Sequence, residues 1–236
     1  MANIITRQIP NTITCCNLIC GCIAACYAFK GDYETAVLFI IGGAVFDFFD
    51  GMSARMLGVS SPIGKELDSL ADDVTFGVAP SAILFSLLHE VSWPDALAPI
   101  EDYIPYAAFV MAAFSALRLA KFNLDTRQTT SFIGLPTPAN ALFWGSLVVG
   151  GHSVLTSCPW AGVGLLVGIL LFSCLLVAEL PLFALKFKNL SWADNWVKYV
   201  FVVGCLPCFL LGYGCFAAII LWYVVWGVIT NCVAKH

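Results

Sequence analysis

Long apolar runs recur along this whole chain, and they constrain its fold more than any other feature. Hydrophobic residues fill 60% of the 236 positions, only 11% are charged, and the mean hydropathy is +0.89. Soluble domains carry about 25% charged residues, and a helix needs roughly 20 apolar residues to cross a bilayer. The pattern predicts an all-α, polytopic transmembrane helical bundle that forms a single integral membrane domain over residues 1–236.

The apolar runs divide into eight expected transmembrane helices. With the N-terminus inside, ten of the eleven basic residues fall on the inner side, and Lys30 is the exception. Cytoplasmic loops are rich in Lys and Arg, so both termini are expected in the cytoplasm. The expected spans are 13–29, 36–56, 65–88, 103–122, 138–153, 160–185, 196–211 and 213–233.

Two acidic clusters interrupt the second and third of these spans. Asp47 and Asp50 are three residues apart, and Asp68 and Asp72 are four residues apart, so each pair shares one face of its helix. A short inner segment, 57–63, joins the two helices as antiparallel neighbours. We therefore expect all four carboxylates to face one pocket near the cytoplasmic surface.

Four converging carboxylates need protonation, basic partners or metal ions to offset their charge. Oxygen ligands without His or Cys suit Mg²⁺, Mn²⁺ or Ca²⁺, and two divalent ions would balance four aspartates in a site suited to phosphoryl chemistry. Gly51, Ala54 and Gly64 lie on the same faces. These small residues either let a ligand approach the backbone or let the helices pack closely.

The complete spacing of this region resembles the signature of the CDP-alcohol phosphotransferase family, with eight fixed positions over 26 residues. The resemblance implies transfer of a phosphoryl-containing group from a CDP-linked donor to an alcohol, with release of CMP. It also implies a six-helix core, a homodimer, and a site that opens to the cytoplasm. The matching pattern is Asp47-x2-Asp50-Gly51-x2-Ala54-Arg55-x8-Gly64-x3-Asp68-x3-Asp72.

Two further stretches, Pro10–Gly21 and Arg118–Ala141, resemble prokaryotic phosphatidylserine synthases. That resemblance implies CDP-diacylglycerol and L-serine as substrates, phosphatidylserine and CMP as products, and a prokaryotic inner membrane as the location. It covers about the first 140 residues, so the spans after about residue 190 are expected to be peripheral to the core.

The family resemblance also assigns roles to individual residues. Asp47, Asp50 and Asp68 would ligate metal, and Asp72 would bind the second of two Mg²⁺ or Mn²⁺ ions and act as general base. No Ser–His pair or Cys nucleophile is evident, which favours direct displacement over a covalent enzyme intermediate. The residues expected at the nucleotide are Gly51, Ala54, Arg55, Gly64, Asn11 and Thr14.

A serine acceptor needs a cation for its carboxylate, and the inner side after the fourth span offers Arg118 and Lys121, with Asn123 and Ser131 to orient the molecule. The same basic residues can instead anchor the chain at lipid headgroups. Other acceptors (glycerol 3-phosphate, inositol phosphate or choline) stay open, as does a cation-coupled transporter with intramembrane aspartates. No basic patch interleaved with aromatics indicates nucleic-acid binding.

Overall fold

A computed structural model describes residues 4–59, 61–124, 132–158, 160–183 and 192–234, which are almost entirely helical. Each of the eight predicted spans contains between one and three consecutive helices, and two short segments form a two-residue antiparallel pairing. The elements are α1 (Ile4–Ala28), α2 (Tyr33–Leu57), α3 (Pro62–Asp72), π-helix η1 (Asp73–Val78), α4 (Ala79–Glu90), 3-10 helices η2 (Asp95–Ile100) and η3 (Ile104–Ala108), α5 (Phe109–Leu124), β1 (Phe132–Ile133), α6 (Thr137–Ser157), α7 (Ala161–Val177), β2 (Pro181–Leu182), α8 (Trp192–Cys205), 3-10 helix η4 (Pro207–Gly214) and α9 (Cys215–Ala234).

Within the described residues, five helical segments are long and apolar enough to cross a membrane, and α7 is a shorter apolar helix. This result confirms the predicted fold class, an all-α polytopic membrane protein. The five segments are Gln8–Ala28, Tyr33–Leu57, Pro62–Glu90, Ile104–Leu124 and Pro207–Asn231.

Two predicted spans extend past the end of their α-helix. The span predicted over 160–185 ends at Val177, and the strand β2 follows it. The span predicted over 196–211 is helical only to Cys205, after which Pro207 opens the 3-10 helix η4. Proline has no N–H to donate to an α-helical hydrogen bond, so the α-helix ends ahead of it.

The turn between α2 and α3 is short because both helix ends are capped. Gly58 closes α2 with a φ of +61°, a left-handed conformation that glycine adopts readily. The Ser61 side chain then accepts a hydrogen bond from the Gly64 N–H (3.0 Å), and Pro62 occupies the first turn of α3. The chain therefore returns beside α2 after very few residues, which brings the two acidic clusters together.

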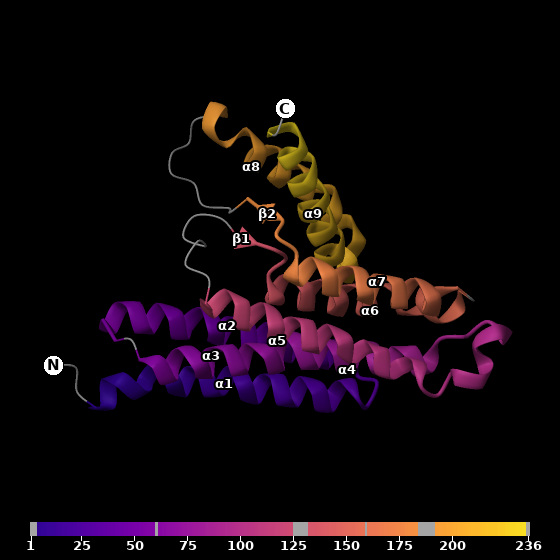
Figure 1. Cartoon of the computed structure of the whole chain (residues 1–236), viewed down its shortest axis with the longest axis horizontal. Helices are drawn as coiled ribbons and strands as arrows, with labels where there is room; N and C mark the ends of the chain where they lie inside the picture. The colour runs from indigo at the N-terminus through magenta and orange to yellow at the C-terminus, as the bar shows by residue number, and fades with distance from the viewer. Residues whose placement is uncertain (1–3, 60, 125–131, 159, 184–191, 235–236) are drawn as a thin grey trace.

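Helices α1 to α7 run roughly along the long axis of the molecule, whereas α8 and α9 rise from them at a steep angle (Figure 1). Helix α9 joins the bundle at the middle of α6. There the Ser146 hydroxyl donates to the Tyr213 carbonyl (2.6 Å) and accepts from the Ala217 N–H (3.1 Å). The sequence analysis predicted that the spans after about residue 190 are peripheral to the core, and this stays a prediction.

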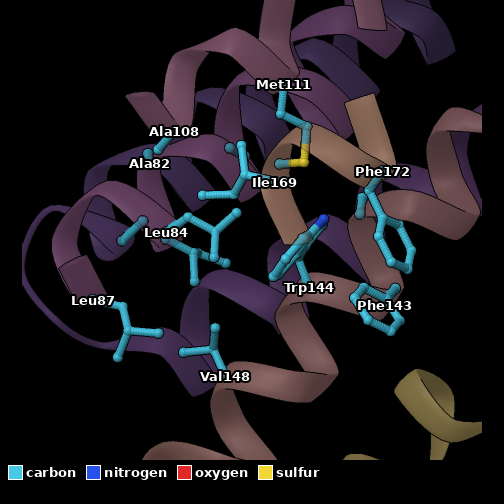
Figure 2. Close-up of a cluster of buried hydrophobic side chains, with 14 of the residues drawn as sticks. Ala82, Leu84, Leu87, Ala108, Met111, Phe143, Trp144, Val148, Ile169 and Phe172 are labelled. Atoms are coloured by element: carbon cyan, nitrogen blue, oxygen red, sulfur yellow. The ribbon is translucent and has the colours of Figure 1, made fainter. Parts of the chain in front are cut away.

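The apolar core lies between α4, α5, α6 and α7, as Figure 2 shows. Leu84, Met111, Trp144 and Ile169 are each at most 2% exposed. Phe172 of α7 stacks on the ring of the neighbouring α6 residue Phe143, with centroids 4.1 Å apart. This packing fixes the positions of α5, α6 and α7 relative to α4 and η1.

A polar contact ties three helices together at the end of the bundle that holds the start of α2. Glu90, the last residue of α4, pairs with His152 of α6 through Oε2 and Nε2 (2.7 Å). Its other oxygen accepts a hydrogen bond from the Tyr33 hydroxyl of α2. Asp47 and Asp50 lie toward the opposite end of α2.

Candidate active site

Three carboxylates from two helices meet beside the α2–α3 turn. Asp47 and Asp50 of α2 and Asp68 of α3 each place one oxygen within 4.8 Å of the others. Asp50 is only 6% exposed, and one oxygen of Asp68 is buried without a hydrogen-bond partner. Among the described residues, no Lys or Arg forms an ion pair with these aspartates. Grouped oxygen donors without a basic partner fit a hard divalent cation.

Thr14 connects the first helix to this triad. Its hydroxyl donates a hydrogen bond to Asp50 Oδ2 (2.6 Å) from the buried face of α1. The hydrogen bond fixes one Asp50 oxygen and leaves the other available to a ligand. The sequence analysis predicted Thr14 at the nucleotide, and the structure places it on Asp50 and in the wall of the cavity described below.

The fourth predicted carboxylate, Asp72, lies outside the triad and has a different partner. Asn17 of α1 donates from Nδ2 to Asp72 Oδ1 (3.1 Å), and the Asn17 backbone carbonyl accepts from the Thr75 hydroxyl (3.0 Å). A Cβ on Gly43 would lie 2.5 Å from the Thr75 methyl group, so this glycine permits the close approach of α2. The sequence analysis missed Asn17; the signal was a lone amide in an apolar run.

A cavity of about 250 Å³ opens beside Asp50 and Asp68 at the α2–α3 turn. It contains most of the predicted nucleotide contacts, together with residues that the sequence analysis did not single out. Arg55 is not part of its wall, and its exposed side chain lies next to Gly51. The cavity is lined by Pro10, Asn11, Thr14, Asp50, Gly51, Ala54, Val59, Ser61, Gly64, Lys65 and Asp68.

Small residues keep this cavity open. A Cβ on Gly64 would lie 3.0 Å from both Asn11 Oδ1 and Ser61 Oγ, which is closer than side-chain atoms normally approach. A Cβ on Gly51 would lie 3.4 Å from the Arg55 guanidinium. The geometry agrees with a ligand site formed by α1, α2 and α3, and nucleotide binding there stays a prediction.

Of the residues predicted for the acceptor, Arg118 of α5 is buried and interacts with an aspartate of the site. Its side chain is buried, at 8% exposure, and its Nε has no hydrogen-bond partner. The guanidinium lies 5.9 Å from the centroid of the Phe122 ring and interacts electrostatically with Asp72. A buried cation with an unused donor is suited to binding an anionic group of a ligand.

The other three predicted acceptor contacts differ from Arg118. Lys121 is exposed. Asn123 links α5 to α3: its side-chain amide donates to Ser69 Oγ (2.7 Å), and its backbone carbonyl accepts from Lys65 Nζ (2.8 Å). Ser131 lies outside the residues that the structure describes. The structure therefore gives Asn123 a contact between helices that its position in the sequence did not indicate.

The bundle, with an acidic triad beside a cavity, has the features of a membrane-embedded site for a charged ligand. The sequence model for CDP-alcohol phosphatidyltransferase matches residues 7–202. The chain belongs to this family, which confirms the resemblance that its eight-position signature indicated.

Curated relatives show which members of the family this chain is similar to. A Bacillus subtilis protein named CDP-diacylglycerol–serine O-phosphatidyltransferase is 42% identical over 132 residues, which are 56% of this chain and 70% of that protein. Proteins with the same name from Helicobacter pylori and Saccharomyces cerevisiae are 36% and 37% identical over 135 and 130 residues. These matches cover 56% and 51% of this chain but only 54% and 44% of the relatives.

Proposed function

We propose that this protein transfers the phosphatidyl group of CDP-diacylglycerol to the hydroxyl of L-serine, giving phosphatidylserine and CMP. The observation that carries the proposal is the cavity whose wall includes Asp50 and Asp68 of the acidic triad. Family membership and the names of the relatives support this donor and this acceptor. Substrate tails can lie between the helices while the diphosphate reaches the carboxylates.

The proposed metal ligands are Asp47, Asp50 and Asp68, with Asp72 shared with a second ion, and the ions are Mg²⁺ or Mn²⁺. Such ions, when bound, neutralise the negative charge of the diphosphate and of its leaving group. The hydrogen bond from Thr14 orients the Asp50 carboxylate for metal binding. Gly51, Ala54 and Gly64 leave room for the nucleotide, and Asn11 and Arg55 lie next to two of these small residues.

Asp72 is the proposed general base. It takes the proton of the serine hydroxyl as the serine oxygen attacks the phosphorus that carries diacylglycerol. A new oxygen–phosphorus bond forms, the bond from that phosphorus to the CMP oxygen breaks, and CMP leaves with the electron pair. Asn17 orients the Asp72 carboxylate through its 3.1 Å hydrogen bond, and Arg118 pairs with the serine carboxylate, with Lys121, Asn123 and Ser131 as further predicted contacts.

We also propose a prokaryotic inner membrane, a homodimer, and a site that faces the cytoplasm. The orientation is supported by the distribution of basic residues. Arg55, Lys65, Arg118 and Lys121 lie at the end of the bundle that holds the acidic triad, whereas Lys30 lies at the opposite end. An excess of Lys and Arg marks the cytoplasmic side of a membrane protein.

The test is a product assay with purified protein in detergent–lipid micelles that contain CDP-diacylglycerol. Radiolabelled L-serine and glycerol 3-phosphate are supplied in parallel, and CMP and lipid products are measured. We expect labelled phosphatidylserine and an equal amount of CMP, and both are expected to disappear in Asp72→Asn while CDP binding is retained. Glycerol 3-phosphate as the only accepted alcohol would refute the acceptor assignment, and no CMP release would refute enzymatic transfer.

A further inference from the structure

A layer of buried polar side chains lies behind the active site and has no role in the mechanism above, Arg118 excepted. Ten buried side-chain nitrogen and oxygen atoms of the described residues have no hydrogen-bond partner. Eight of the ten come from four neighbouring elements, η1, α5, α6 and α7, and one of the eight is the indole nitrogen of Trp144 in the apolar core. We call the other residues of these eight the polar layer: Asp73, Ser115, Arg118, Thr137, Asn140 and Ser173.

The first part of the polar layer lies where η1 meets α5. A Cβ on Gly77 would lie 2.7 Å from Asp73 Oδ1 and 2.8 Å from Ser115 Oγ, so these two side chains flank the same point, and the Ser115 hydroxyl lies close enough to Asp73 to act on its carboxylate. Arg118 is three residues further along α5 on the same face and interacts electrostatically with Asp72. Asp72 faces α1, while its neighbour Asp73 faces α5.

The second part lies between α6 and α7, which touch at two levels. Nearer the apolar core, the Trp144 ring lies 2.9 Å from the position of a Cβ on Gly168. Nearer the aspartates, the Leu135 N–H donates to the Leu175 carbonyl (3.0 Å). The stretches 137–143 and 169–174 are therefore held beside each other between these two contacts.

Helical periodicity places the polar residues of both stretches on the buried side. Asn140 and Thr137 precede Trp144 by four and seven residues, so all three share one face of α6. Asn140 is 0% exposed, and Thr137 and Ser173 are each 1% exposed. The interior that is apolar around Trp144 and Met111 (Figure 2) thus becomes polar about one helical turn nearer to Asp72.

A buried polar group without a partner costs about 1–3 kcal/mol, and nearly all such groups in folded proteins bind protein, water or a ligand. The polar layer combines a guanidinium donor, a carboxylate, a complete amide and three hydroxyl groups. Water alone would satisfy single groups. The polar layer instead holds both a buried cation, Arg118, and a buried carboxylate, Asp73, the two groups that a small zwitterion needs.

We propose that the polar layer is the acceptor-binding site and selects an amino acid by both of its charges. Arg118 binds the carboxylate, while the Asp73 carboxylate and the Asn140 carbonyl oxygen bind the ammonium group. The acceptor hydroxyl then points toward Asp72, the residue next to Asp73 on η1. This proposal rests on the proposed function and adds Asp73, Asn140 and Thr137 to the residues that determine the acceptor.

The test compares Asn140→Leu and Asp73→Asn with Ser146→Ala, a control on α6 that removes a buried hydroxyl outside the polar layer. We expect the KM for L-serine to rise about 10- to 100-fold in the first two variants, because each loses a hydrogen bond to a charged group. The KM for CDP-diacylglycerol, CDP binding and the melting temperature are measured on the same samples. Asn140→Ser replaces Asn140→Leu if that variant does not fold.

A second measurement uses 3-hydroxypropionate, which has the hydroxyl and carboxylate of serine but no ammonium group. Asp73→Asn is expected to reduce the preference for L-serine over this analogue at least tenfold, which a purely structural role would not do. An unchanged serine KM and an unchanged preference would show that the polar layer holds only water. If the parent protein makes no phosphatidylserine, both the proposed function and the acceptor site are refuted. If the parent protein does make it, the results for the variants decide whether the polar layer binds the acceptor.

Discussion

Asn17→Leu tests how the position of Asp72 is maintained. In the described structure, the Asn17 amide makes the side-chain hydrogen bond to Asp72, at 3.1 Å from Oδ1. Leucine has the same branched shape as asparagine, is larger and removes the donor. It also removes the buried Asn17 Oδ1, which has no hydrogen-bond partner, and the melting temperature is measured beside the activity to detect overpacking.

The expected magnitude follows from the strength of that hydrogen bond. A hydrogen bond to a charged group contributes about 1.5–3 kcal/mol, and 1.36 kcal/mol corresponds to a tenfold change in rate. Asn17→Leu should therefore lower kcat by about 10- to 100-fold. Asn17 does not line the cavity, so the KM for CDP-diacylglycerol should stay within about twofold of the parent value, well below a tenfold (1.4 kcal/mol) difference.

The assay is CMP release at saturating serine, with Thr12→Ala as a control on the exposed side of α1. A double-mutant cycle with Asp72→Asn separates positioning from general damage. Loss of the base alone should cost about 10²- to 10⁴-fold, and Asn17→Leu should add little to that loss. A parental kcat in Asn17→Leu, or full additivity in the double variant, would refute the reasoning.

Three further predictions concern the cavity, the metal and the far end of the bundle. Gly64→Ala should raise the KM for CDP-diacylglycerol several-fold in steady-state assays, because its Cβ would lie 3.0 Å from Asn11 Oδ1 and Ser61 Oγ; an unchanged KM would show that the nucleotide binds elsewhere. Dialysis against EDTA should stop CMP release, and Mg²⁺ or Mn²⁺ should restore it, whereas full activity after chelation would exclude a metal role for the triad. Glu90→Gln should lower the melting temperature by a few degrees, since it weakens the contact with His152, and any change in serine KM would contradict its remoteness from the site.

The acidic site was largely predictable because its information is local. Asp47 and Asp50 share a helix face through their spacing alone, and Gly58 and Ser61 determine how the chain turns back. The antiparallel return then brings Asp68 within reach of both. Charged residues in an apolar helix are costly, so their presence indicated function before any helix was placed.

The polar layer was not predictable, because it depends on how distant helices are rotated against each other. Ser115, Asn140 and Ser173 look like ordinary small or polar residues in apolar runs, and only the packing of α5, α6 and α7 shows that all three are buried. The end of α7 at Val177 was missed for a related reason. Glu179 and Pro181 stand among the apolar residues after it; proline cannot donate a helical hydrogen bond, and β2 pairs with β1 instead.

The π-helix η1 spans Asp73–Val78. Its geometry implies that the number of residues in this segment is more tightly constrained than the type of each residue. A π-turn contains one residue more than an α-turn. The side chains of α3 are therefore rotated about the helix axis relative to those of α4, compared with a continuous α-helix. Deleting one residue there would restore a continuous α-helix and turn the acidic face of α3 by about 100° relative to α4. Substitutions within this segment alter one side chain, whereas a one-residue deletion would misalign the entire catalytic face.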